Sequence, residues 1–358
     1  MRDASGSEFK RDYHRYIVLK VLFIVGLLAS ILLISGVALS LGGRDISVTE
    51  VFRILWHHIT GYVPEYHSEE WYDDYAIYNV RLPRILVGII AGAGLAIGGG
   101  AMQPTVRNPL ADPYTTGISS GACFGVALAI ALGFSVHSHN NLGLVINAFV
   151  FGLVPAALVI VMSRFRNTSP ATIILTGVAL SFLFNALSVI ILVGSDAEKI
   201  QAAYLWQIGT LENVSWDVIP VMLTVTLIGA GALIALSPKI NIMTLGDSSS
   251  RSLGLDANTF RIIILVILSV MTASIVGYIG IIGFVGLVSP HIVRLILGSD
   301  NRYAIPASAL FGAAFLLFAD LLARLIIYPG ELAVGVVMAF IGAPIFLFLI
   351  IRNRREIW

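Results

Sequence analysis

Long apolar stretches separated by short polar connections fill most of this 358-residue chain. A membrane-spanning helix needs about 20 mostly apolar residues, and ten stretches approach that length. The range is nine to eleven, because 283–297 is short and closely follows 262–281. The ten predicted spans are 17–40, 82–103, 114–133, 142–163, 171–194, 216–236, 262–281, 283–297, 304–323 and 332–351. The pattern predicts an all-α integral membrane protein, with one transmembrane domain over 17–351 between tails at 1–16 and 352–358.

Composition and charge agree with this class and orient the spans. The chain is 57% hydrophobic and 12% charged, whereas an ordinary soluble domain is about 25% charged. With an even number of spans and the N-terminus inside, sixteen of the 22 basic residues fall on the cytoplasmic side, as expected for an inner-membrane protein. Both termini are then cytoplasmic. The net charge of +1 gives no indication of nucleic-acid binding.

The outer connection over 41–80 is predicted to contain an interfacial helix. Ser47 and Glu50 have capping-box spacing, and apolar residues follow at helical intervals. These are Val51, Phe52, Leu55 and Ile59. The tyrosines and Trp71 that follow, among acidic residues, are typical of an interfacial belt, although they could also form a docking surface.

The cytoplasmic connection over 236–260 is predicted to contain a short ordered helix. Asp247 and the serines after it can cap such a helix, and Gly246 and Gly254 bracket it with turn signals. Leu253 and Leu255 give it an apolar side. A small, partly apolar helix on the cytoplasmic face favours a partner protein over a solvated connector.

Two spans have small residues at every fourth position, which let helix backbones approach closely in lipid. The first stripe is Gly88, Gly92, Ala96 and Gly100, and the second is Gly117, Gly121, Gly125, Ala129 and Gly133. Tight static packing explains such stripes, and helix sliding during gating is the alternative.

Several kinds of chemistry find no support in the residues. No phosphate-binding loop occurs, since Gly-Lys is absent from the sequence, and the histidines lack the company of a metal site or a catalytic partner. The single cysteine, Cys123, lies within a predicted span, where redox chemistry is not expected. Asp320 and Arg324 have i,i+4 spacing, which favours a structural ion pair over a proton-coupling site.

A polar hairpin joins the second and third predicted spans. Prolines after Asn108 and Asp112 punctuate it, and Asp112 is expected to be the N-cap of the third span. Leu110 presents an apolar side chain at this turn, where two copies meeting at an axis could close a pathway.

Several motifs resemble the FecCD-type permeases of binding-protein-dependent ABC importers, which move iron-siderophore chelates, haem, cobalamin and related cargo. They occur in order across nearly the whole chain. The motifs are RLPR at 81–84, RNPLADP at 107–113, GFVGLVSPHIVRL at 283–295, GSDNR at 298–302, ADLLAR at 319–324 and ELAVG at 331–335. The resemblance implies ten spans per subunit and a homodimer with one central pathway. Two ATPase subunits below and a soluble binding protein above complete the implied complex.

The resemblance also implies roles for particular residues. Arg81, Arg84 and Arg324 match arginines that dock the binding protein, and Asn108 and Leu110 match the cytoplasmic gate turn. The coupling helix that contacts the ATPase matches Leu245, Gly246, Asp247, Arg251, Leu253, Gly254 and Leu255. Asp247 with its serines, and Ala333 in ELAVG, depart from the usual family residues, which puts the coupling contacts in doubt and could soften the start of the last span.

The sequence therefore predicts a non-enzymatic translocation subunit that binds no cofactor itself, with ATP and Mg²⁺ held by the partner ATPase. An iron-siderophore chelate is the favoured cargo, with cobalamin, haem and molybdate as alternatives. An ion-gradient-driven carrier is the alternative from another class. A sensing receptor would need a signalling domain, and only seven residues follow Ile351.

Overall fold

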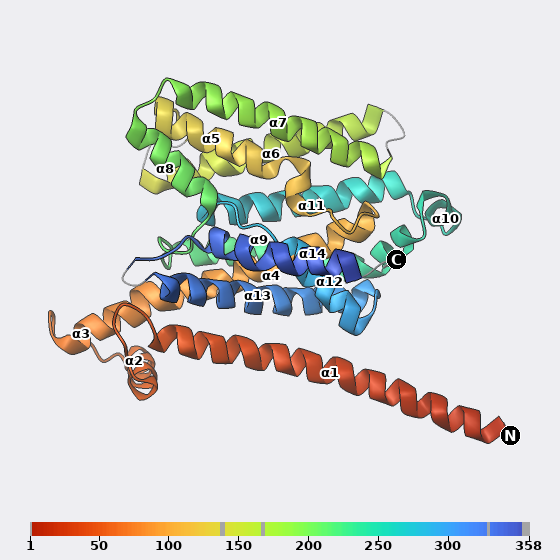
Figure 1. Ribbon diagram of the computed structural model, residues 1–358, viewed down its shortest axis with the longest axis horizontal. Helices are drawn as coiled ribbons and strands as arrows, with labels where there is room; N and C mark the ends of the chain where they lie inside the picture. The colour runs from red at the N-terminus through yellow and green to blue at the C-terminus, as the bar shows by residue number, and fades with distance from the viewer. Residues whose placement is uncertain (1, 137–139, 166–168, 328–329, 353–358) are drawn as a thin grey trace.

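The computed structural model describes residues 2–136, 140–165, 169–327 and 330–352, and these residues are arranged as parallel and antiparallel helices (Figure 1). The elements are α1 (Arg2–Ser40), α2 (Val48–Thr60), α3 (Glu69–Asp74), the π-helix η1 (Tyr75–Arg81), α4 (Leu82–Thr105), the 3₁₀-helix η2 (Pro113–Thr116), α5 (Ile118–Leu132), α6 (Asn140–Phe165), α7 (Pro170–Val193), α8 (Ala197–Ile208), α9 (Val218–Thr244), α10 (Asp247–Ser252), α11 (Ala257–Ile279), α12 (Val285–Leu297), α13 (Asn301–Ile326) and α14 (Val334–Arg352).

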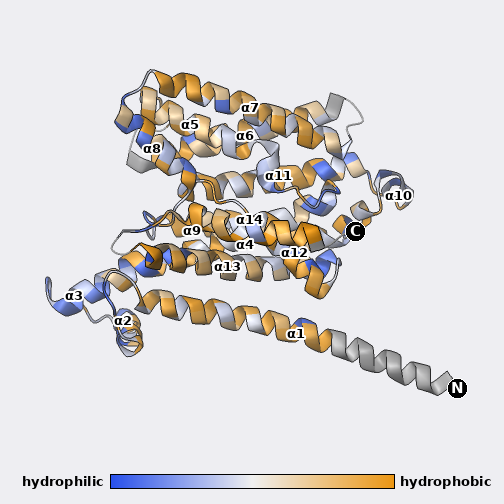
Figure 2. Cartoon of the chain, viewed as in Figure 1, coloured by the Kyte–Doolittle hydropathy of each residue, from blue (hydrophilic) through white to orange (hydrophobic). Residues whose placement is uncertain are grey.

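The predicted membrane class is confirmed. Among the described residues, eight helical segments are long and apolar enough to cross a membrane, and α5 and α12 are shorter apolar helices. Together they account for the ten predicted spans. They lie along the long axis of the molecule, with α2, α3 and α8 at one end and α10 at the other (Figure 1). We refer to these as the α2 end and the α10 end. Apolar residues dominate between the two ends (Figure 2).

The central helix, α4, packs against α9, α11, α12 and α13. Glycine makes this close approach possible: a Cβ added at Gly92 would lie 2.4 Å from the carbonyl oxygen of Gly312 on α13. Gly88 lies against the side chain of Leu317, whereas a Cβ at Gly100 would meet its nearest neighbour at an ordinary 3.7 Å. The stripe on α4 is thus in close backbone contact at Gly92, while Gly100 has room for a side chain.

The second small-residue stripe joins α5 to α6. Added Cβ atoms at Gly121 and Gly125 would lie 2.4 Å from the carbonyl oxygens of Phe151 and Asn147. Gly117 precedes α5 and has φ +87°, a left-handed conformation that glycine adopts without strain. These contacts give the stripe a packing role in the observed arrangement, and sliding along it stays a prediction.

The interfacial helix of the outer connection is present as α2, and Ser47 caps it by accepting a hydrogen bond from the Glu50 amide. The expected apolar face is divided. Val51 and Ile54 are buried against the end of α1, whereas Phe52 and Ile59 are exposed. Because α2 uses one side for packing on α1, its remaining apolar side chains face outward.

Two predicted boundaries are wrong. The connection predicted over 236–260 is shorter, because α9 continues through Pro238 to Thr244. Asp112 caps η2 by accepting from the Thr115 amide, and α5 begins only at Ile118. Pro238 does not end α9, and the residues after Asp112 form a short 3₁₀-helix before α5 begins.

Candidate functional site

The turn over residues 107–112, which follows α4, is held by its own polar groups. We call it the gate turn. The Asn108 side chain accepts a hydrogen bond from the Leu110 amide at 2.9 Å, and the Ala111 amide donates to the Asn108 carbonyl. Such side-chain-to-backbone bonds fix short turns. Leu110 is 51% exposed at its tip, so an ordered turn presents an apolar side chain outward.

Asp112 ends the gate turn in a partly desolvated position. Its carboxylate accepts from the Thr115 amide, which favours the charged form. Burial outweighs this contact and raises the pKa of Asp112 to about 6 from its ordinary 3.8. The gate turn therefore contains a carboxyl group that titrates close to neutral pH.

Side chains from a distant helix complete the hydrogen bonding of α4 just before the gate turn. Pro104 has no N–H, so the carbonyl of Gly100 lacks its helical donor. Arg294 on α12 donates from Nη2 to that carbonyl at 2.7 Å and from Nη1 to the side chain of Gln103. Buried backbone carbonyls are costly to leave unbonded, which explains a buried arginine at this point.

A hydrogen bond of the same kind runs in the opposite direction, from a side chain of α4 to a carbonyl of α12. Pro290 leaves the carbonyl of Gly286 without a helical donor, and Gln103 of α4 donates to this oxygen at 3.4 Å. At this contact a Cβ on Gly99 would lie 1.7 Å from the Gly286 oxygen. Each helix thus satisfies a carbonyl that a proline exposes in the other, and the contact requires glycine.

The short helix predicted in the connection after α9 is present as α10, at the end of the molecule that carries the gate turn, and its coupling role stays a prediction (Figure 1). Within this helix Ser250 is buried, and its hydroxyl hydrogen is shared between the carbonyls of Ile242 and Gly246. Leu245 and Leu253 flank the helix, and each is 60% exposed. A short ordered helix with exposed leucines on both sides is suited to a partner surface.

The turns around α10 differ in detail from the sequence prediction. Gly246, with φ +96°, is the N-cap, so Asp247 is the first helical residue and not the cap. At the other end Gly254 is left-handed, and the Leu255 amide donates to the carbonyl of Ser250. Asp247 is thereby free to make an ion pair with Arg261 of α11, at 2.8 Å.

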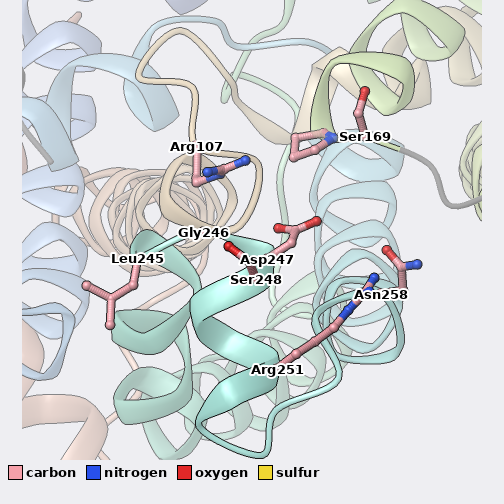
Figure 3. A pocket seen from close by; sticks show the side chains of 9 residues that line it. Arg107, Ser169, Leu245, Gly246, Asp247, Ser248, Arg251 and Asn258 are labelled. Atoms are coloured by element: carbon pink, nitrogen blue, oxygen red, sulfur yellow. The ribbon is translucent and has the colours of Figure 1, made fainter.

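A cavity of about 390 Å³ separates the gate turn from α10 (Figure 3). Arg107 of the gate turn lies over Gly246, where an added Cβ would be 3.0 Å from its Nη1. The lining residues are Arg107, Ser169, Pro170, Leu245, Gly246, Asp247, Ser248, Arg251 and Asn258. The gate turn and α10 therefore form two walls of one polar cavity.

At the α2 end, Arg84 belongs to a buried ion network. It pairs with Asp320 of α13 at 2.8 Å and with Glu331 at 2.6 Å. Arg324 also approaches Asp320, at 3.4 Å, which confirms the predicted i,i+4 ion pair. Asp320 is 1% exposed. A buried carboxylate requires such partners, and here two arginines supply them.

Arg81 and Arg324 bind the end of α1. Arg81 donates to the carbonyls of Leu39 and Ser40, and Arg324 donates to that of Ala38. These are among the last carbonyls of α1, which lack helical donors and attract cations. All three predicted docking arginines are buried, at 4–6% exposure.

Groups of the same chain thus contact each of the three guanidiniums, although Nε and Nη2 of Arg324 have no hydrogen-bond partner among the described residues. Their role in docking a binding protein stays a prediction. Direct contact with a binding protein would require a rearrangement at this end, and without it the arginines would contribute through the shape of the surface.

Gln103, Asn241 and Asn301 were missed by sequence reasoning. Asn241 near the end of α9 accepts from the Asn301 amide, and its own amide donates to Asp300. Hydrogen bonding from Arg302 lowers the pKa of Asp300 to about 2. The available signal was polar residues at the ends of apolar helices, whose partners depend on the fold.

The comparisons with known proteins agree with this architecture. The model of the FecCD transport family matches residues 18–352. The chain is 35% identical to the Fe(3+)-citrate import system permease protein YfmD of Bacillus subtilis, covering 95% of each chain. It is 40% identical to the cobalamin import system permease protein BtuC of Halobacterium salinarum, covering 77% of this chain and 73% of the relative.

A solved structure assigned to the metal-chelate type of ABC transporter, in an inward-facing conformation, is also similar. Its TM-score is 0.80 at 30% identity, covering 92% of this chain and 98% of the other. The match of the family model over almost the entire chain, with the ten apolar helices in place, shows that the protein belongs to the FecCD transport family of ABC importer permeases.

Proposed function

We propose that this permease forms a homodimeric pathway for an iron chelate, with its α10 end in the cytoplasm. Two ATPase subunits bind at that end, and a substrate-binding protein delivers cargo at the α2 end. The observation that carries the proposal is the pairing of the gate turn with α10. Exposed leucines lie on the ordered gate turn and beside α10, and residues of both elements, Arg107 and Leu245 among them, line one cavity.

The orientation is supported by the distribution of basic residues, most of which fall on the α10 side. The gate turn of each copy would place Leu110 at the cytoplasmic mouth of the pathway. ATP binding would draw the ATPase subunits together and displace α10, and the gate turn would follow. Cargo then crosses after the binding protein releases it.

An iron chelate is the favoured cargo because a relative that covers 95% of the chain is named for Fe(3+)-citrate import. Cobalamin is the second candidate, since the relative named for it has the higher identity over the aligned part. Both cargoes are bulky, so the apolar lining of the spans suits a pathway that leaves recognition to the binding protein.

The test is uptake by proteoliposomes that contain the permease, its ATPase and its binding protein. We expect ATP-dependent accumulation of radiolabelled ferric citrate or ferric siderophore. Accumulation of cobalamin with no response to ferric chelates would overturn the choice of cargo. A complex with an inactivated ATPase is the control.

Uptake by proteoliposomes also distinguishes the proposed importer from an ion-gradient-driven carrier. Vesicles that contain the permease alone, with a proton or sodium gradient, should show no concentrative uptake. Accumulation under these conditions would overturn the proposed mechanism.

A further inference from the structure

One buried side chain joins the coupling helix to the helix that carries the gate turn. Arg261, near the start of α11, donates from Nη2 to Asp247 of α10 at 2.8 Å. Its Nε donates to the carbonyl of Thr105, the last residue of α4, at 3.3 Å. Asp247 and Thr105 are far apart in sequence, and Arg261 brings α10 and α4 into a single hydrogen-bonded unit.

The guanidinium geometry suits this bridge. Its N–H donors point in fixed, coplanar directions, so Nη2 and Nε can hold two acceptors at once. Nη1 donates to the side-chain oxygen of Asn258 at 3.1 Å, so all three nitrogen atoms of the guanidinium are hydrogen-bonded. Arg261 is 2% exposed, and the exclusion of water strengthens these bonds relative to a surface ion pair.

The carbonyl of Thr105 can accept this hydrogen bond because it lies at the end of α4. Thr105 ends the helix, so its carbonyl has no donor in a following helical turn. The carbonyls of Gln103 and Pro104 accept instead from the amides of Asn108 and Arg107 in the gate turn. The bond from Arg261 therefore holds the same short segment that sets the path of the gate turn.

Contact between α10 and the gate turn elsewhere is looser. Arg107 lies over Gly246, and the cavity described above occupies the space beside it (Figure 3). A displacement of α10 could be absorbed by this cavity. Arg261 offers a direct connection that bypasses it.

We propose that Arg261 is a positioning residue that transmits displacement of α10 to the gate turn. The inference rests on the proposed function, in which the ATPase moves α10. When α10 moves, Asp247 draws the guanidinium with it, and the bond to Thr105 shifts the end of α4. Charge neutralisation of Asp247 alone is the alternative role, and it needs no bond to α4.

The experiment measures movement of the gate turn in the assembled complex without requiring a known cargo. Cys123→Ala removes the one native cysteine, and Leu110→Cys places a thiol on the gate turn. The rate of labelling by a maleimide is compared between nucleotide-free and ATP-vanadate-trapped complexes in proteoliposomes. ATP hydrolysis is recorded in parallel.

In the parent we expect the labelling rate to change by roughly fivefold or more between the two states, the lower range of typical coupling effects. Arg261→Met should abolish that change while ATP hydrolysis continues, because the ATPase keeps its own catalytic residues. Arg261→Lys keeps the charge beside Asp247 but lacks the coplanar donors, so it should also lose most of the change. Arg302→Met removes an exposed arginine paired with Asp300 and should respond like the parent.

An unchanged nucleotide response in Arg261→Lys would overturn the transmitting role and leave only charge neutralisation. That variant decides the question if Arg261→Met does not assemble. Absence of any response in the parent would instead contradict the proposed coupling of α10 to the gate turn, and the role of Arg261 with it. Loss of the response in Arg302→Met would show a general effect of cytoplasmic charge and overturn the specific role.

Discussion

The candidate functional residues at the two ends of the molecule differ in their exposure. At the α2 end, arginines 81, 84 and 324 are buried and bonded within the chain. At the α10 end, leucines 110, 245 and 253 are exposed on ordered turns. Burial of charge and exposure of leucine both cost free energy unless a partner or a precise geometry compensates.

This difference indicates which of the candidate residues are already bonded within a single chain. At the α2 end, Arg81 and Arg84 bind carbonyls and carboxylates of the same chain, and Arg324 contacts Asp320 and the carbonyl of Ala38. The three leucines at the α10 end have no such partner within the described residues, and exposed leucines on ordered turns are expected of a surface that binds another subunit. The sequence motifs marked both ends as functional but did not separate these two situations.

Breaking the network at the α2 end should give the largest loss of stability. Arg84→Met leaves the buried Asp320 with Arg324 as its one remaining cation among the described residues, while Glu331 is exposed. Removing one partner of a buried pair costs about 3–5 kcal/mol, to be measured as the free energy of unfolding in detergent. Arg53→Met, in an exposed pair with Glu50, is the control and should cost less than about 1 kcal/mol. Equal losses would refute the contrast between buried and exposed arginines.

Disturbing the α4–α12 contact should have the next largest effect. Gly99→Ala forces a methyl group onto the Gly286 carbonyl, and overpacking of this kind costs about 3 kcal/mol, at the upper end of the usual range. The adjacent Gly100→Ala meets only ordinary contacts and should be neutral or slightly stabilising. Thermal unfolding of the two variants side by side checks this, and equal melting temperatures would contradict the observed packing.

Stability at the gate turn should depend on pH through Asp112. Its folded pKa of about 6 lies above the ordinary 3.8, so the folded state binds the proton more tightly. The contribution of Asp112 to the free energy of unfolding is then fully present below about pH 4, and roughly 1–3 kcal/mol of it is lost as the pH rises through 6.

Asp112→Asn should remove that part of the pH dependence, because an asparagine can still cap η2 and does not ionise. The measurement is the unfolding free energy between pH 4 and 8 for both proteins. Parallel curves for the two proteins would rule out Asp112 as the titrating group.

The smallest effect on stability is expected at the exposed leucine of the gate turn. Leu110→Asn should change the unfolding free energy by less than about 0.5 kcal/mol, as for most surface substitutions. It should raise solute leakage through dimers in proteoliposomes, because the apolar contact between copies is weakened. Unchanged leakage with unchanged stability would argue against a gating role for Leu110.

Local rules were sufficient for several features of the fold. The length of the apolar runs predicted the ten helices, and the spacing of Ser47 and Glu50 predicted the cap of α2. The Asp320–Arg324 pair also followed from helical spacing. Each of these depends on residues within a few positions of one another, where helix geometry fixes which side chains meet.

The chain by itself therefore determined its membrane class, its helices and, through its motifs, its family. Only the tertiary structure decided that Arg84 faces Asp320, that Gln103 reaches the Gly286 carbonyl, and that Arg261 joins α10 to α4. These partners lie far apart in sequence and meet only when the helices pack. Helical periodicity specifies the face a residue occupies but not the helix that covers it, so burial of the arginines could not be predicted from their positions at helix ends.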